Sequence, residues 1–247
     1  MKQLLLPPTE KRKQFELRAL GLRDFAGVAG DQALDPFALA QFAKLMVVDF
    51  DQIEGLSLQS RAHLLGDAAD EWSGGACSQP LPNGWRIVIL NPAHGLHRNR
   101  ATLMEEVAHV FLGHKANRLA AITDDTSPSP LGRGSRGRVT GDASSPLPQP
   151  LSQRRGAKEE SSDATKQSHG RMLTRDYNAV DEEAAYAIGA AALVPYAALR
   201  RLVLEGRTAD EIARRFRVSR QLTEYRIKVT HLWAEYKRAS ASRTQHV

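Results

Sequence analysis

The chain has 247 residues, a formal net charge of +6 and 42% hydrophobic residues, which together predict a soluble globular protein with a substantial core. Cys77 is the only cysteine, which excludes an internal disulfide and any metal or iron–sulfur cluster held by several cysteines of one chain. Because Pro7 and Pro8 interrupt the N-terminal apolar residues and no apolar run is long enough to span a bilayer, we expect a cytoplasmic protein that neither enters a membrane nor is secreted.

The first predicted element is a helix over residues 36–47 (PFALAQFAKLMV). Its apolar residues recur close to helical spacing, so one face would lie in the core. Asp35 is in the position of an N-cap and Pro36 in the first helical position, a combination that favours a helix start.

Strands are predicted further along the chain. WRIVILNP, from Trp85 to Pro92, is an apolar and β-branched run that follows the turn dipeptide Asn-Gly and ends at Asn-Pro. Val47 and Val48 indicate a second, shorter strand, whereas residues 72–81 (WSGGACSQPL) have the composition of a loop.

An amphipathic helix that carries titratable side chains is predicted from Arg98 to about Gly113 (RNRATLMEEVAHVFLG). Glu105 and His109 are four residues apart, so they share one helical face and can converge on one ion, while Glu106 lies about 100° around the axis. The zinc-binding H-E-x-x-H helix has this geometry, with two ligands and an intervening Glu that acts as general base. The alternative is that both glutamates are solvated helix charges and that His109 is a partly buried structural histidine.

Glu105 stands where that motif has its first His. A carboxylate is an accepted zinc ligand, but it adds negative charge and favours harder ions, so we expect zinc with manganese as the alternative. His114 lies off the face of Glu105 and His109 in a continuous helix. It would reach the ion only if the helix ends at Gly113.

Residues 123–171 differ in composition from the rest of the chain. They are rich in Pro, Gly and Ser and nearly lack large apolar side chains, so they cannot bury enough surface to offset the entropy of ordering. We therefore predict a disordered insertion. Without it about 200 residues remain, which is the size of one domain.

Helical pattern resumes at Val180 and continues to the basic C-terminal end. Residues 200–247 hold twelve Lys or Arg against five Asp or Glu. Thr208 and Glu211 have capping-box spacing, and the following segment is helix-turn-helix-like. A DNA-binding function is the competing hypothesis, with phosphate contacts from the arginines and base contacts from Arg220 and Gln221 near the start of the last predicted helix.

Three blocks of the sequence together resemble the ImmA/IrrE-type metallo-endopeptidases. RATLMEEVAHVFLGH is similar to the zinc-binding helix of that family. DEEAAYAIGAAALVP is similar to its second helix, in which a Glu followed by Ala supplies the third metal ligand, and RTADEIARRFRVSRQLTEYRI is similar to the segment that follows. With the preceding strand, the resemblance covers most of residues 35–233 outside the insertion.

The resemblance implies an α+β, mostly helical, zincin-like metallopeptidase domain with a small sheet and a helix-turn-helix-like C-terminal part. It makes Glu106 the catalytic base. Glu105, His109 and Glu183 become the metal ligands, with Glu182 as the runner-up to Glu183 and His114 as a further candidate. The strand at residues 85–90 would be the sheet edge that binds an extended peptide substrate.

The implied reaction is hydrolysis of a peptide bond, directed at a transcriptional repressor or another regulatory protein. The alternative is a catalytically impaired homologue that binds protein or DNA through its basic C-terminal helices. The predicted domains are an N-terminal extension (1–34), the first part of the metallopeptidase-like domain (35–122), the insertion (123–171), the second part of the domain (172–238) and a disordered tail (239–247).

Overall fold

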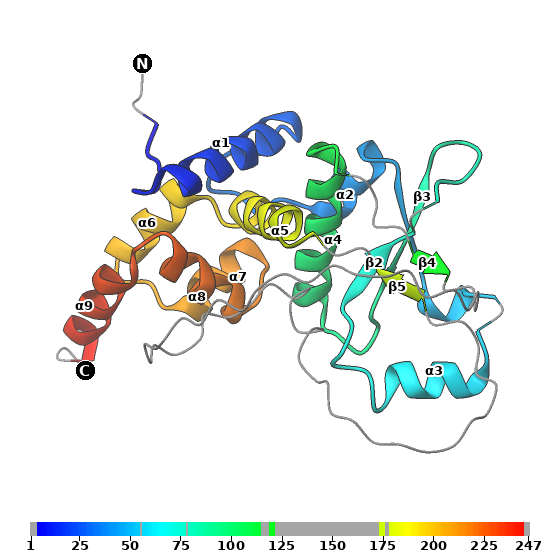
Figure 1. The fold of residues 1–247 in the computed structure, drawn as a ribbon. Helices are drawn as coiled ribbons and strands as arrows, with labels where there is room; N and C mark the ends of the chain where they lie inside the picture. Colours follow the sequence, from blue (N-terminus) through cyan, green and yellow to red (C-terminus); the bar gives the residue numbers. More distant parts are fainter. Residues whose placement is uncertain are drawn as a thin grey trace, which may run out of the picture.

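Nine α-helices and five short strands form the described part of the computed structural model, which comprises residues 4–54, 56–77, 79–114, 119–121, 173–175 and 178–244. The helices are α1 (Glu10–Phe25), α2 (Pro36–Phe42), α3 (Leu58–Leu65), α4 (Leu96–Phe111), α5 (Ala179–Leu193), α6 (Tyr196–Leu204), α7 (Ala209–Phe216), α8 (Arg220–Val229) and α9 (Trp233–Thr244). The strands are β1 (Leu45–Val48), β2 (Gly74–Ala76), β3 (Arg86–Leu90), β4 (Leu119–Ala121) and β5 (Leu173–Arg175), and the 3-10 turn η1 (Phe50–Gln52) follows β1. Helix α4 lies between the strands on one side and α1 and α5–α9 on the other (Figure 1). The fold is therefore mostly helical and α+β, as predicted.

The main sheet has three strands in the order β1-β3-β2, with β1 parallel and β2 antiparallel to β3. The strand predicted over residues 85–90 is confirmed as β3, but the expectation that it forms an edge is wrong, because it is paired on both sides. Sequence reasoning assigned β2 to a loop because its sequence is Gly-Gly-Ala. Gly74 has a φ of 147°, and a Cβ there would lie 2.7 Å from the carbonyl oxygen of Ile89, so only glycine fits this close approach.

Helix α2 begins as predicted and ends earlier. The Asp35 side chain accepts a hydrogen bond of 3.2 Å from the Phe37 N–H, which is the expected N-cap. The predicted helix extended to residue 47. It ends at Phe42 because Lys44 adopts a left-handed conformation, with a φ of 54°, before β1 begins.

The predicted N-terminal extension is part of the core rather than an appendage. Helix α1 packs on α5. Its Ala19 is fully buried and its Leu22 is almost fully buried. The same buried face carries Glu16 and Arg23, each 1% exposed, and two charges in an apolar stripe obscure its amphipathic pattern. At the other end of the chain, α9 extends to Thr244, so the predicted disordered tail is helical over residues 239–244.

Residues 122–172 lie outside the described residues, and the predicted insertion at 123–171 falls within them. The two strands that flank this segment, β4 and β5, pair with each other in antiparallel orientation. Leu119 is opposite Arg175, and Ala121 is opposite Leu173. The chain therefore leaves and re-enters the described fold at adjoining positions.

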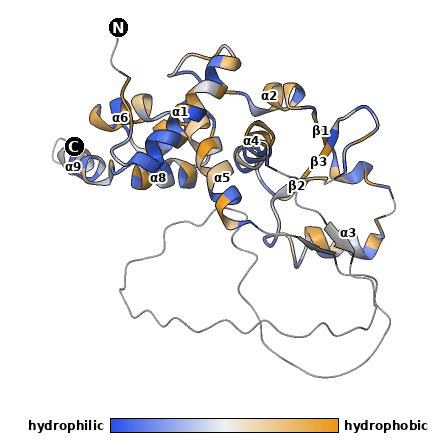
Figure 2. Cartoon of the chain, turned by 45° about the horizontal axis from the view of Figure 1, so that its top comes forward, coloured by the Kyte–Doolittle hydropathy of each residue, from blue (hydrophilic) through white to orange (hydrophobic). Residues whose placement is uncertain are grey.

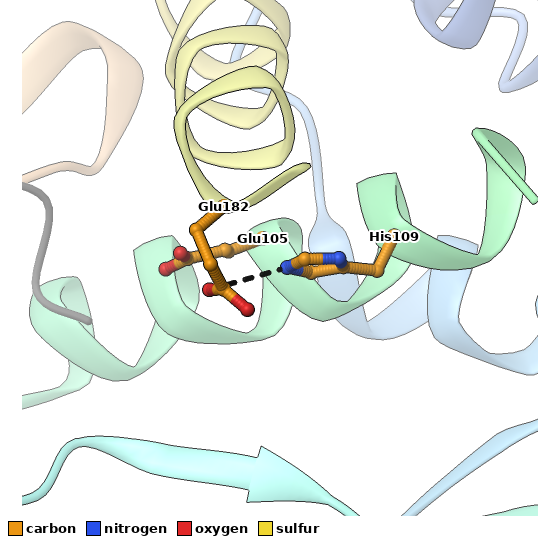
Figure 3. Close-up of side chains that lie close together, drawn as sticks. All are labelled: Glu105, His109 and Glu182. Atoms are coloured by element: carbon orange, nitrogen blue, oxygen red, sulfur yellow. Dashed lines mark ion pairs between the residues drawn. The ribbon is translucent and has the colours of Figure 1, made fainter. Parts of the chain in front are cut away.

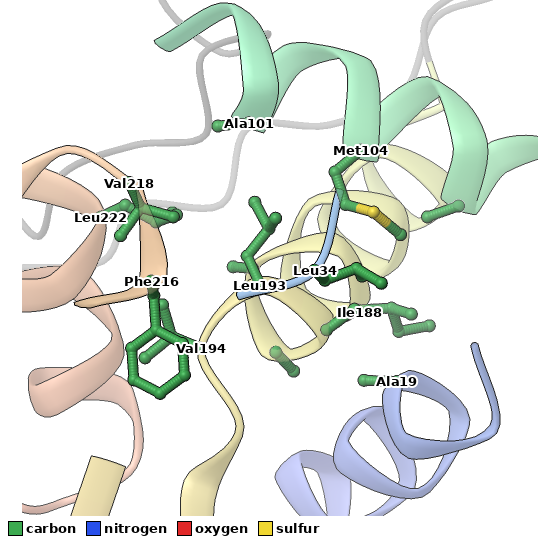
Figure 4. Close-up of a cluster of buried hydrophobic side chains, with 14 of the residues drawn as sticks. Ala19, Leu34, Ala101, Met104, Ile188, Leu193, Val194, Phe216, Val218 and Leu222 are labelled. Carbon is green, nitrogen blue, oxygen red and sulfur yellow. The ribbon is translucent and has the colours of Figure 1, made fainter. Parts of the chain in front are cut away.

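The hydrophobic core is centred on α5, which is predominantly apolar and packs against α1, α4 and α8 (Figures 1 and 2). Ile188 and Leu193 of α5 meet Met104 of α4 and Ala19 of α1 in this core (Figure 4). The many alanines of α5 allow neighbouring helices to approach closely. One close approach is at Gly189, where a Cβ would lie 3.2 Å from the Met104 carbonyl oxygen and 3.3 Å from the Glu105 nitrogen.

Helices α5 and α6 bear on the question of a membrane span. Among the described residues, no single helix is both long and apolar enough to cross a membrane. Together α5 and α6 would satisfy length and composition, across a bend of 56°. Most residues of both helices are buried inside the protein.

We expect Gly189→Val to lower the free energy of unfolding by about 1–3 kcal/mol, because the added atoms would force α5 away from α4 in a packed core. Urea denaturation measures this change. Gly21→Ala is the matched control in α1. A Cβ at Gly21 would meet nothing within 4 Å, so this helical substitution should stabilise the protein by about 0.5–1 kcal/mol. Equal stabilities of Gly189→Val and wild type would contradict the close packing of α4 and α5.

Candidate metal centre

Glu105 and His109 of α4 and Glu182 of α5 form one group of possible metal ligands, here called the ligand group (Figure 3). One ligand atom from each residue lies within 4.8 Å of the other two. The His109 Nε2 and a Glu182 carboxylate oxygen are 3.5 Å apart. The i, i+4 spacing on α4 aligns Glu105 with His109 as predicted, and the start of α5 brings Glu182 against them.

The donors and their spacing fit a small divalent ion. Two ligand atoms bound at roughly 2.0–2.2 Å to a tetrahedral ion are about 3.4 Å apart, close to the distance between His109 and Glu182. Glu105 is 6% exposed and Glu182 is 3% exposed, so two carboxylates converge where water screens them poorly. A divalent cation would compensate this charge, and one imidazole with two carboxylates suits zinc or manganese.

Glu183, which the sequence ranked ahead of Glu182, lies away from the ligand group. Its carboxylate forms an ion pair of 2.7 Å with the Lys11 ammonium of α1, and the Arg12 guanidinium is 3.9 Å away. Adjacent residues of a helix point about 100° apart, so only one of the two glutamates can face α4. The structure thus brings the runner-up, Glu182, into the group in place of Glu183.

His114 contacts His109 and is not a member of the ligand group. Gly113 has a φ of 68° and ends the helical path, so the predicted condition for a contribution from His114 is met. The His114 Nδ1 then lies 3.0 Å from the His109 Nδ1, and its Nε2 lies 3.5 Å from an Asp181 carboxylate oxygen. Burial lowers the pKa of His114, which favours the neutral form of its ring.

Two further residues bear on the chemistry of the site. Glu106 follows Glu105 on α4 and is half-buried, so part of this residue is accessible to solvent. Tyr186 lies one turn after Glu182 on α5, a spacing that sequence reasoning did not use. Burial raises the pKa of the Tyr186 hydroxyl, and the nearby charges of Tyr225 and Glu105 raise it further, so the hydroxyl keeps its proton at physiological pH.

One family model matches part of the chain. Residues 163–228 match the model of the IrrE N-terminal-like domain, peptidase family M78. This match confirms the resemblance inferred from the sequence for this segment of the chain. The matched segment includes α5 with Glu182. Helix α4, which carries Glu105 and His109, precedes this segment in the sequence, and the fold brings the three side chains together. No curated protein and no solved structure matches the chain significantly.

The C-terminal part of the M78-matched segment contains α7 and most of α8, the predicted helix-turn-helix-like unit. Its capping box is confirmed, because the Thr208 hydroxyl accepts a bond of 3.1 Å from the Glu211 N–H and the Glu211 carboxylate accepts one of 2.7 Å from the Thr208 N–H. Six of the ten residues of α8 are buried, including Arg226. Arg220, at its start, is paired with Glu224 at 2.8 Å. Helix α8 is therefore mainly a core element, while Arg220 and Gln221 at its start are exposed.

Proposed function

We propose that the chain is a metal-dependent endopeptidase, in which the ligand group holds the ion and Glu106 is the catalytic base. The observation that carries this proposal is the convergence of Glu105, His109 and Glu182 from two helices at a buried point. The M78 match supports the same activity and comes from a different segment of the chain than α4. The small sheet beside α4 and the second ligand helix α5 fit a zincin-like domain.

Hydrolysis of a peptide bond at the ligand group requires a side chain that accepts a proton from water and later donates it. A zinc ion bound there, or manganese, would lower the pKa of a water molecule and polarise the carbonyl of the scissile bond. Glu106, one residue along α4 from Glu105 and accessible to solvent, would accept a proton from the attacking water and deliver it to the leaving amine nitrogen. Glu105 in place of a histidine adds negative charge, which makes the ion a weaker Lewis acid and favours manganese more than two histidines would.

The proposed substrate path runs along β2. Strand β3 is enclosed by two neighbours. Among the described residues, β2 has one unpaired side in the main sheet and packs against α4. An extended peptide would add to this edge through backbone hydrogen bonds. The Gly-Gly-Ala sequence of β2 supports this role, because side chains as small as these leave the backbone accessible to a peptide.

The proposed target is a transcriptional repressor or another regulatory protein of the cytoplasm. Support for this target is the resemblance to the ImmA/IrrE-type enzymes, strengthened by the M78 match. A peptidase that acts on a folded regulator needs an exposed, extended segment of that regulator, which the β2 edge would accept.

Cleavage of purified repressors in the presence of zinc or manganese tests the proposed function. The full chain is incubated with each repressor and with unfolded casein, and products are identified by mass spectrometry. We expect cleavage that EDTA abolishes and that added metal restores. Stoichiometric metal binding without cleavage of any of these proteins would instead support the catalytically impaired homologue.

A further inference from the structure

We propose that His114 and Asp181 are positioning residues that set the proton on His109, so that its Nε2 presents a lone pair to the ligand group. This inference rests on the proposed metal site. It assigns a role to the two residues that follow His109 on the side away from Glu182. The four side chains involved follow one another in space in the order Asp181, His114, His109 and Glu182. They come from the end of α4 and the first turn of α5.

The first step concerns the two ring nitrogens of His109. Its Nε2 faces the Glu182 carboxylate at 3.5 Å, and its Nδ1 lies 3.0 Å from the Nδ1 of His114. A hydrogen bond between two imidazole nitrogens needs a proton on one and a lone pair on the other. A metal ligand needs its own lone pair, so the proton of His109 belongs on Nδ1, and the Nδ1 of His114 must accept it.

Asp181 determines that the Nδ1 of His114 can act as this acceptor. The Nε2 of His114 lies 3.5 Å from one carboxylate oxygen of Asp181, which can only accept, so the proton of His114 belongs on Nε2 and its Nδ1 keeps a lone pair. The other carboxylate oxygen of Asp181 accepts a bond of 2.8 Å from the Asn178 side chain. This arrangement of protons satisfies the three contacts behind the Nε2 of His109. It leaves that Nε2 with a lone pair that faces the Glu182 carboxylate, so a bound cation would complete the fourth contact.

Local backbone geometry holds this arrangement. Gly113 adopts the left-handed conformation, and the N–H of His114 donates a bond of 3.0 Å to the His109 carbonyl oxygen. This turn places the two rings edge to face, with centroids 5.1 Å apart. Asp181 and Glu182 are consecutive on α5. One turn of this helix therefore supplies Glu182 to the ligand group and Asp181 as the carboxylate that faces His114.

Zinc affinity of three chains tests the proposal: wild type, His114→Asn and His114→Leu, each measured by competition with a chromogenic chelator. Loss of an outer partner of a ligating histidine typically lowers metal affinity by about 10–100-fold, which is the loss expected for His114→Leu. Asn places its side-chain oxygen near the position of the histidine Nδ1, so His114→Asn should still accept the proton of His109 and bind zinc nearly as wild type does. If His114 had only a structural role, the zinc affinities of His114→Asn and His114→Leu would not differ in this way.

Nitrogen-15 NMR of the metal-free full chain above pH 7 gives a readout that does not depend on zinc. We expect the proton of His109 on Nδ1 and that of His114 on Nε2. A proton on the Nδ1 of His114, or His114→Leu with wild-type zinc affinity, would overturn the proposal. A wild-type chain with the expected tautomers that binds no zinc would contradict the proposed function and leave the proton arrangement confirmed.

Discussion

Replacing Glu106 by Gln is expected to reduce kcat for peptide hydrolysis by about 10²–10⁴-fold, the usual contribution of a general base. Gln has nearly the same shape as Glu but cannot accept a proton from water at neutral pH. The ligand group does not include Glu106, so metal content and KM should stay close to those of wild type. Steady-state cleavage of a repressor-derived peptide, with the metal content of the same sample, gives these quantities.

Lys11→Ala is a suitable control for Glu106→Gln. It removes the exposed ion pair of Glu183, which lies outside the ligand group, and should leave kcat unchanged. If Glu106→Gln cleaves at the wild-type rate, another residue must serve as the base and the assigned role of Glu106 is wrong. If it loses both metal and activity, Glu106 belongs to the ligands.

Glu16→Leu is expected to lower the free energy of unfolding by about 3–5 kcal/mol, because it leaves a buried guanidinium without its counter-charge. Glu16 and Arg226 form an ion pair of 2.6 Å with side chains that are 1% and 3% exposed. The second carboxylate oxygen of Glu16 accepts the N–H of Tyr196, and the Nε of Arg226 donates to the carbonyl oxygen of Val194. The pair therefore joins α1 and α8 to the junction of α5 and α6, and urea denaturation measures its loss.

Two variants make this prediction specific. Lys13→Ala breaks an exposed ion pair with Glu10 on the same helix and should cost about 0–1 kcal/mol. The double variant Glu16→Leu with Arg226→Met removes both buried charges and should recover much of the stability lost by Glu16→Leu alone. A cost for Glu16→Leu no larger than that for Lys13→Ala would contradict the structural importance of the buried pair.

Features encoded within a few residues could be predicted from the sequence. The N-cap of Asp35 and the capping box of Thr208 and Glu211 depend on contacts between residues two or three apart, and both are present. The spacing of Glu105 and His109 follows from helical periodicity alone. The apolar run that forms β3 predicted a strand, although it could not show which strands lie beside it.

Features set by distant segments could not be predicted. The choice between Glu182 and Glu183 depends on Lys11, which belongs to a helix that the sequence pattern did not reveal. That helix was missed because Glu16 has its partner, Arg226, more than two hundred residues away, and a buried charge looks like a solvent-facing one until its partner is known. Strand β2 was missed for another reason, since Gly74 is required by the close approach of β3 rather than by strand propensity.

Metal titration of wild type, Glu182→Gln and Glu183→Gln is the most direct test of the ligand group. Calorimetry with zinc and with manganese, followed by metal analysis of the desalted proteins, reports stoichiometry and affinity. We predict one ion per chain for wild type and for Glu183→Gln, and no stoichiometric ion for Glu182→Gln. Retention of the ion by Glu182→Gln together with its loss from Glu183→Gln, or a wild-type chain that binds neither metal, would contradict the assigned centre.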